Sequence, residues 1–139
     1  MKKTFILILL ALVAFACPLN KITPEQQAYL NRAMQQPIPV IVSTVQAEEA
    51  WGRIQSFIKL CSSRKAQIAT DYLIDTYNPA DKSDYYFYKA EKKVKGNTVE
   101  INLEVLWDHG QRREKCDRNL HLLAYYIVTG KLIPELVFK

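Results

Sequence analysis

The residues on either side of Gly96-Asn97 constrain the fold of this chain more than any other stretch. Residues 85–94 and 99–107 are rich in aromatic and β-branched side chains, and apolar positions alternate with polar ones, which is typical of β-strands. A glycine in the first position of a two-residue turn suits a type II′ hairpin. The sequence therefore predicts two antiparallel strands joined at residues 96–97.

This turn also predicts which residues face each other. If Lys95 faces Thr98, one face of the hairpin pairs apolar residues and the other pairs lysines with glutamates. Lys92 opposite Ile101 is the one exception on the apolar face. The other expected pairs are Val94–Val99, Ala90–Leu103, Tyr88–Val105, Tyr86–Trp107, Lys93–Glu100 and Lys89–Glu104. A shift by one residue would turn every side chain to the wrong face, so this register is strongly favoured.

Two other stretches have the spacing of helices with one buried face. The first follows a short apolar strand at residues 40–42, and Ser43 with Gln46 has the pattern of a capping box at its start. The second has Asp108 as its expected N-cap and ends at Gly130. The expected buried positions are Ala47, Ala50, Trp51, Ile54, Phe57, Ile58 and Cys61 in the first helix, and Cys116, Leu120, Leu123, Ala124 and Ile127 in the second.

The remaining elements complete the predicted fold. Residues 66–77 alternate in the manner of a single strand, and Thr23-Pro24 has the pattern of a helix start. The order from residue 40 is strand, helix, three strands and helix. The sequence therefore predicts an α+β fold of β-α-β-β-β-α order, with an antiparallel sheet and two helices on one of its faces.

The first 16 residues have the pattern of a bacterial-type secretory signal. Two lysines follow Met1, and the run from Phe5 to Ala16 is apolar but shorter than the roughly 20 residues that a spanning helix needs. Ala14-Phe15-Ala16 has the small-x-small pattern of a cleavage site. The alternative is an N-terminal membrane anchor that is not removed.

Cleavage after Ala16 would leave Cys17 as the first residue, which resembles the lipobox of bacterial lipoproteins. The resemblance implies a lipid anchor on Cys17 and a place in the bacterial cell envelope, facing the periplasm or the surface. An ordinary signal peptidase, leaving a plain cysteine on a periplasmic or secreted chain, is the alternative. We expect residues 17–37 to form a tether with one short helix and residues 38–139 to form a single domain.

Charge argues against nucleic acid as a partner. The chain has a net charge of +5, and removal of residues 1–16 with their two lysines would lower it to +3. This value is mild, and an exported protein does not meet nucleic acid. The partners that we expect are the membrane, through the lipid anchor, and a protein of the envelope.

The three cysteines are Cys17, Cys61 and Cys116. If Cys17 carries lipid, the other two can pair in an oxidising compartment. Such a bond would stabilise the fold by about 4 kcal/mol through loop closure. The sequence favours a Cys61–Cys116 disulfide, and the alternative is two separate buried thiols.

The order of elements over residues 40–130 resembles the helix-grip domains of some bacterial envelope lipoproteins. In those domains a strand leads into a helix that begins as residues 47–51 do here, with Ala-Glu-Glu-Ala-Trp, and then into a meander. The resemblance implies an assembly or binding module of the envelope with no catalytic site.

The sequence offers few candidates for catalysis. His109 follows Asp108 at a strand-to-helix corner, and a hydrolase could use it as a general base, but a histidine of a turn is the simpler interpretation. Neither His109 nor His121 has a partner at the spacing of metal ligands, and no phosphate-binding loop is present. We therefore expect no enzyme activity, no metal and no cofactor.

A predicted contact surface lies on the outer face of the hairpin. Phe87 would point outward opposite Leu106, with Tyr85 beside it, and an exposed apolar patch of this kind marks a binding site. The other interpretation, which the sequence slightly favours because both segments need a place to pack, is that residues 18–37 or 132–138 cover it. The sequence thus favours a non-enzymatic envelope module, with a small secreted inhibitor or immunity-type protein and a small hydrolase using His109 as alternatives.

Overall fold

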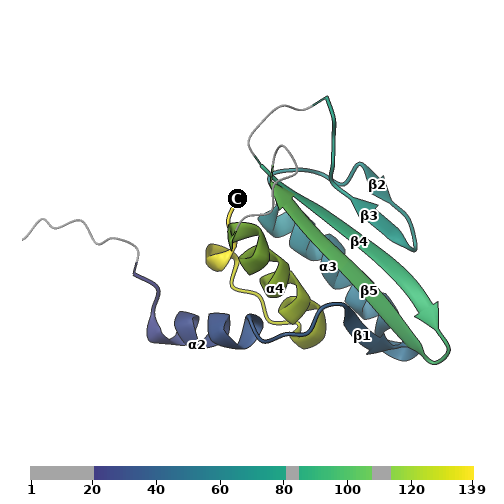
Figure 1. The fold of residues 1–139 in the computed structure, drawn as a ribbon, viewed down its shortest axis with the longest axis horizontal. Coiled ribbons are helices and arrows are strands. Elements are labelled where there is room, and N and C mark those ends of the chain that lie inside the picture. Colours follow the sequence, from purple (N-terminus) through teal and green to yellow (C-terminus); the bar gives the residue numbers. More distant parts are fainter. Residues whose placement is uncertain (1–20, 81–84, 108–113) are drawn as a thin grey trace, which may run out of the picture.

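The computed structural model describes residues 21–80, 85–107 and 114–139, and Figure 1 gives their arrangement. The predicted α+β class is confirmed. The elements, in chain order, are α2 (Pro24–Ala33), β1 (Val40–Ser43), the 3₁₀ helix η1 (Thr44–Gln46), α3 (Ala47–Cys61), β2 (Ile68–Ala69), β3 (Leu73–Asp75), β4 (Tyr86–Lys95), β5 (Thr98–Trp107), α4 (Glu114–Thr129) and the 3₁₀ helix η3 (Pro134–Leu136).

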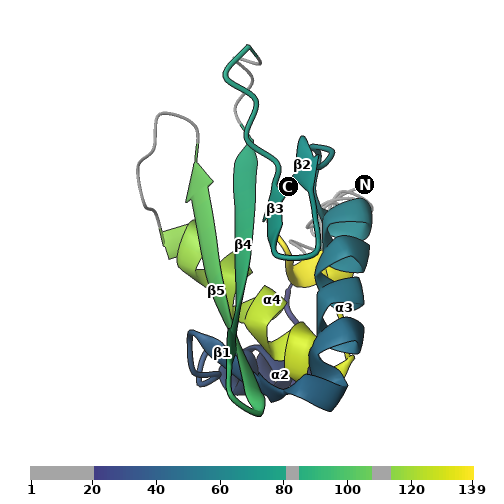
Figure 2. The same ribbon diagram turned by 90° about the vertical axis from the view of Figure 1, so that its right-hand side faces the viewer.

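The sheet has five antiparallel strands in the order β1-β5-β4-β3-β2. Helices α3 and α4 lie on the same side of it in Figure 2. The core is formed where their apolar faces meet the inner side chains of β4 and β5, and its fully buried members include Tyr88, Phe57, Ile54, Ile101 and Leu123. The opposite face of the sheet carries the lysines and glutamates of the hairpin, except Lys92, which bonds to Glu48 and lies over the ring of Trp51 on α3.

The predicted register of the hairpin is confirmed at every pair, from Lys95 opposite Thr98 to Tyr86 opposite Trp107. Gly96 has φ of +63°, the left-handed region that favours glycine. The ion pairs differ from the expected cross-strand ones. The Nζ atom of Lys95 lies 2.5 Å from Glu100, and that of Lys89 lies 3.0 Å from Glu91 on its own strand.

The two predicted helical faces are also confirmed. All seven apolar residues expected on α3 are buried, and the Ser43–Gln46 capping box forms at η1, one turn before α3. All five expected residues of α4 are buried, and two more, Asn119 and Leu122, join them. Gly130 has φ of +68° and ends α4 by donating its N–H to the carbonyl of Tyr126.

The single strand predicted over residues 66–77 is wrong. The structure has two short strands, β2 and β3, that form a hairpin around Asp71-Tyr72. Thr70 closes the turn, because its N–H donates to the carbonyl of Leu73 and its hydroxyl accepts from the N–H of Leu73. Threonine and aspartate side chains compete for backbone groups in this way, so alternation alone was an incomplete guide here.

Helix α2, which the sequence predicted within a tether, packs against α4. Tyr29 is buried, its hydroxyl donates to the carbonyl of Lys131 at 2.7 Å, and its ring meets that of Tyr125 edge to face. Residues 34–38 connect α2 to β1 past the middle of α4, where the carbonyl oxygen of Gln36 lies 3.2 Å from the Nδ1 atom of His121. This connection forms one wall of the pocket described below.

Candidate functional site

Two of the predicted site residues, Cys17 and His109, lie outside the described residues. The same holds for the expected N-cap Asp108. Lipidation of Cys17 and catalysis by His109 therefore stay predictions. His121, the other histidine, lies on α4, and its Nδ1 atom is 3.2 Å from the carbonyl oxygen of Gln36.

Cys61 and Cys116 lie near the same end of the packed helices α3 and α4. Both thiols are close enough to the Tyr88 hydroxyl to contribute to the rise in its pKa, which burial mainly causes. The structure nevertheless has both as free, buried thiols, which matches the alternative of two separate cysteines and not the predicted disulfide. The prediction depended on the compartment, and a disulfide also needs the two sulfur atoms at bonding distance.

The predicted contact surface is largely covered. Phe87 is only 7% exposed, because the ring of Tyr77 packs against it at 5.1 Å and the guanidinium of Arg64 lies 4.4 Å from its centre. Arg64 and Tyr77 belong to the segment between α3 and β4, which is a different cover from both that the sequence suggested. Tyr85 is 37% exposed beneath the same guanidinium. Phe87 is therefore wrong as a free contact residue, and Leu106 is half-buried on the neighbouring strand.

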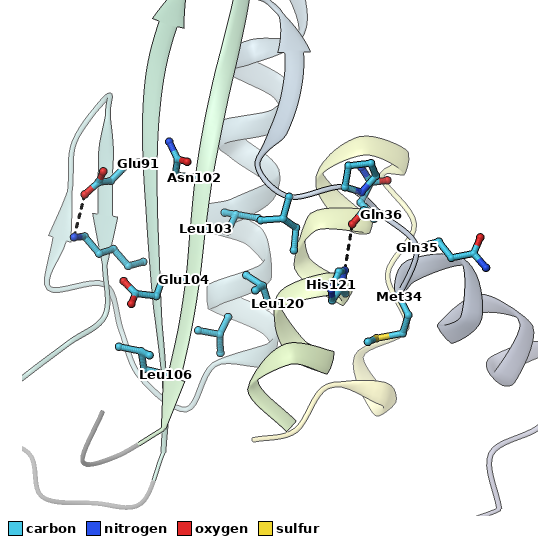
Figure 3. Close-up of a pocket in the computed structure, with 14 residues that line it drawn as sticks. Met34, Gln35, Gln36, Glu91, Asn102, Leu103, Glu104, Leu106, Leu120 and His121 are labelled. Atoms are coloured by element: carbon cyan, nitrogen blue, oxygen red, sulfur yellow. Dashed lines mark hydrogen bonds and ion pairs between the residues drawn. The ribbon is translucent and has the colours of Figure 1, made fainter. Parts of the chain in front are cut away.

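A pocket of about 810 Å³ has Leu106 among its lining residues (Figure 3). Its walls are β5, the middle of α4 and the connection from α2 to β1. This volume lies within the range of sites that hold small ligands and short peptide segments. The apolar lining includes Met34, Ile38, Leu103, Val105, Leu106 and Leu120.

The charged lining lies on the outer face of the sheet. Lys89 and Glu91 bond to each other, and this contact raises the pKa of Lys89 and lowers that of Glu91. Glu104, opposite Lys89, is exposed and forms no ion pair within the described part of the chain. The pocket thus has an apolar inner side and one unpaired carboxylate at its outer rim.

The pocket exists because β1 is much shorter than β5. Strand β1 covers only Thr98–Ile101 of β5, and no described strand lies beside the remaining residues 102–107 on that side. The sequence already indicated this difference in length. The strand predicted at residues 40–42 follows Pro37 and Pro39 and has three residues, whereas the strand predicted at residues 99–107 has nine. A short strand beside a longer one leaves part of the longer strand's edge open.

A second hollow, of about 550 Å³, lies between the end of α3 and β2. Its floor includes Ile58, Ala69 and Ile74, and Lys59 and Lys65 stand at its rim. In the described ranges, no cluster of His, Cys, Asp and Glu side chains could hold a metal ion. None of the described helices is long and apolar enough to cross a bilayer.

The chain matches no protein family, no curated protein and no solved structure.

Proposed function

We propose that this protein is a non-enzymatic binding module of the bacterial cell envelope, and that the pocket beside β5 is its contact site. The observation that carries this proposal is the pocket itself, since it opens between elements that pack on the core. Sites built on such a scaffold hold their shape and suit recognition.

Most titratable groups of the pocket are engaged in contacts with one another or with the backbone, which supports a binding role over a catalytic one. His121 contacts a backbone carbonyl, and Lys89 and Glu91 are engaged with each other. A general base needs a proton to abstract within hydrogen-bond reach and a group that it activates. The described lining contains no serine or cysteine, and its two carboxylates, Glu91 and Glu104, lie on the sheet strands and not on α4.

A photo-crosslinking experiment in the bacterium tests the contact site. p-Benzoylphenylalanine would replace Met34, which lines the pocket and is 42% exposed. The matched control places it at Val45, which is 91% exposed and lies outside the pocket. We expect a discrete crosslinked product at Met34 that Leu106→Arg removes. Equal products at both positions, or none at Met34, would contradict the proposal.

The envelope location is tested separately by the intact mass of the protein from membrane and soluble fractions. We expect a chain that starts at Cys17 and carries added acyl mass in the membrane fraction. A soluble chain without lipid would instead favour the secreted inhibitor or immunity-type alternative. The hydrolase alternative requires that His109→Ala abolish an activity of the wild-type chain.

A further inference from the structure

We propose that the open edge of β5 takes an extended peptide of a partner protein as an additional strand, next to residues 102–106. This inference rests on the proposed binding function and names the kind of partner. Strand addition to a sheet edge uses main-chain hydrogen bonds for affinity and side-chain pockets for specificity.

The direction of the backbone groups on β5 follows from its neighbours. The N–H of Thr76 donates to the carbonyl of Tyr88, and the N–H of Lys92 donates to the carbonyl of Tyr72, so even-numbered residues of β4 face β3. Odd-numbered residues of β4 therefore face β5, where Glu91 and Lys89 meet Asn102 and Glu104. Successive residues of a strand direct their N–H and C=O groups to opposite sides.

It follows that Leu103 and Val105 direct their N–H and C=O groups away from β4, into the open edge. Asn97 is also odd-numbered, and its carbonyl accepts from the N–H of Thr44, on the β1 side. This bond agrees with odd-numbered residues of β5 facing away from β4. No described backbone or side-chain group bonds to Leu103 or Val105 on that side. Leu103 is half-buried and Val105 is only 3% exposed, so the accessible part of this edge is one donor and one acceptor, both on Leu103.

The pocket lies where an added strand would run. Its lining contains both edge residues, Leu103 and Val105, and the connection at residues 34–38 forms the far wall. The volume of about 810 Å³ therefore separates the open edge from the next backbone segment. In Figure 3 the labelled side chains of β5 and of α4 flank this space.

The lining also determines the chemistry of the peptide. Side chains that point inward would meet Leu103, Leu120 and Met34, so we expect apolar residues at alternate positions. Side chains that point outward would lie beside Glu104, whose carboxylate has no described ion partner. We expect lysine or arginine there, which gives an apolar–basic alternation over about four residues.

A displayed library of random dodecamer peptides is the probe for this proposal. Selection on the wild-type protein should enrich sequences in which apolar residues alternate with lysine or arginine. The selected peptide should protect the amide of Leu103 from hydrogen exchange. It should bind less tightly to Leu106→Arg, the variant that blocks the pocket.

Two variants separate main-chain pairing from side-chain contact. Both Leu103→Pro and Leu103→Ala remove most of the leucine side chain. Only Leu103→Pro also removes the backbone N–H, which faces the open edge and does not bond to β4. We expect Leu103→Pro to weaken peptide binding on the order of tenfold more than Leu103→Ala, the equivalent of about one hydrogen bond. If Leu103→Pro does not fold, N-methylation of alternate peptide residues tests the same bonds on the wild-type protein.

The outcomes distinguish this inference from the proposed function. Peptides that Leu106→Arg displaces but that bind equally to Leu103→Pro and Leu103→Ala would overturn strand addition and leave the pocket as a binding site. Enrichment of helical peptides, or of no peptide, would also overturn it. Crosslinking at Met34 in the bacterium then reports independently whether the proposed function holds. A dimer that forms through β5 would overturn the assignment to a partner protein.

Discussion

Asn119 connects three parts of the molecule that are far apart in the sequence. Its side-chain amide donates to the hydroxyl of Tyr88 at 2.9 Å and to the carbonyl of Phe138 at 2.8 Å, and its oxygen accepts from the N–H of Phe138 at 2.9 Å. The side chain is fully buried. One polar residue within the apolar face of α4 thus holds the end of the chain against the sheet.

We expect Asn119→Leu to lower the free energy of unfolding by about 3 kcal/mol, because it leaves the buried partners of the amide without hydrogen bonds. Urea unfolding measures this change. Asn102→Leu, at a half-buried position on the outer face, is the control and should change stability by less than about 0.5 kcal/mol. A loss for Asn119→Leu as small as that of the control would contradict the importance of this network.

The cysteines of the core should be unreactive in the folded protein. Burial raises the pKa of the Cys61 thiol to about 11, and both Cys61 and Cys116 are buried. In a Cys17→Ser chain at pH 8 we expect slow alkylation under native conditions and two rapid alkylations in denaturant, without a reducing agent. The appearance of these thiols only after reduction would restore the disulfide that the sequence favoured.

At the scale of elements, glycine has opposite effects in a turn and in a helix. An added Cβ would meet nothing within 4 Å at either Gly96 or Gly52, so only the backbone distinguishes the two positions. Gly96 has φ of +63°, and Gly52 lies in the helix α3. The two substitutions to alanine therefore form a matched pair.

We expect Gly96→Ala to destabilise the protein by about 1 kcal/mol, since alanine is strained in the left-handed region. Gly52→Ala should stabilise it by roughly 0.5–1 kcal/mol, because alanine has less freedom to lose in a helix. Thermal unfolding of the two variants beside the wild type provides the test. Shifts in the same direction would show that the turn does not require a positive φ.

The predictions of secondary structure were confirmed where one periodic pattern extended over many residues. The hairpin pairs two strands of ten residues each, so a wrong register would misplace many side chains at once. Helix α3 has seven buried residues at regular spacing. Residues 66–77 failed because a tight turn at Thr70 needs only a few local hydrogen bonds, which alternation does not reveal.

For the whole molecule, buried acids predict a loss of stability at alkaline pH. Burial raises the pKa of Cys61 from 9.0 to about 11 and that of Tyr29 from 10.0 to about 12. It also raises the pKa of Tyr88. The folded state holds these protons more tightly than the unfolded state, so the stabilisation is complete below about pH 9 and is lost as the pH rises toward 12.

We expect the urea midpoint to be constant between about pH 7 and pH 8.5 and to fall above pH 9. Tyr29→Phe and Cys61→Ala should each make the decline shallower, because each removes one buried acid. Equilibrium unfolding at a series of pH values measures both effects. A midpoint that stays level up to pH 11 in the wild type would refute the assignment.

The contact site depends on the whole molecule in a different way. Its walls come from residues 34–38, from β5 and from α4, which are brought together only after the sheet and helices pack. The patch predicted from Tyr85, Phe87 and Leu106 was a local inference, and Arg64 and Tyr77 from elsewhere in the chain cover its centre. The exposure of a side chain on one strand therefore depends on distant segments of the folded chain and cannot be inferred from that strand alone.

The fold class, the hairpin register and the buried faces of α3 and α4 could be predicted from local periodicity along the chain. These depend on periodicities of about 2 and 3.6 residues that each stretch carries within itself. Packing in three dimensions determines that Phe87 is covered, that Cys61 and Cys116 are buried as free thiols, and that β5 keeps an open edge. Each of these depends on which distant segments meet, because contacts between them arise from packing in three dimensions and leave no periodic trace in the chain.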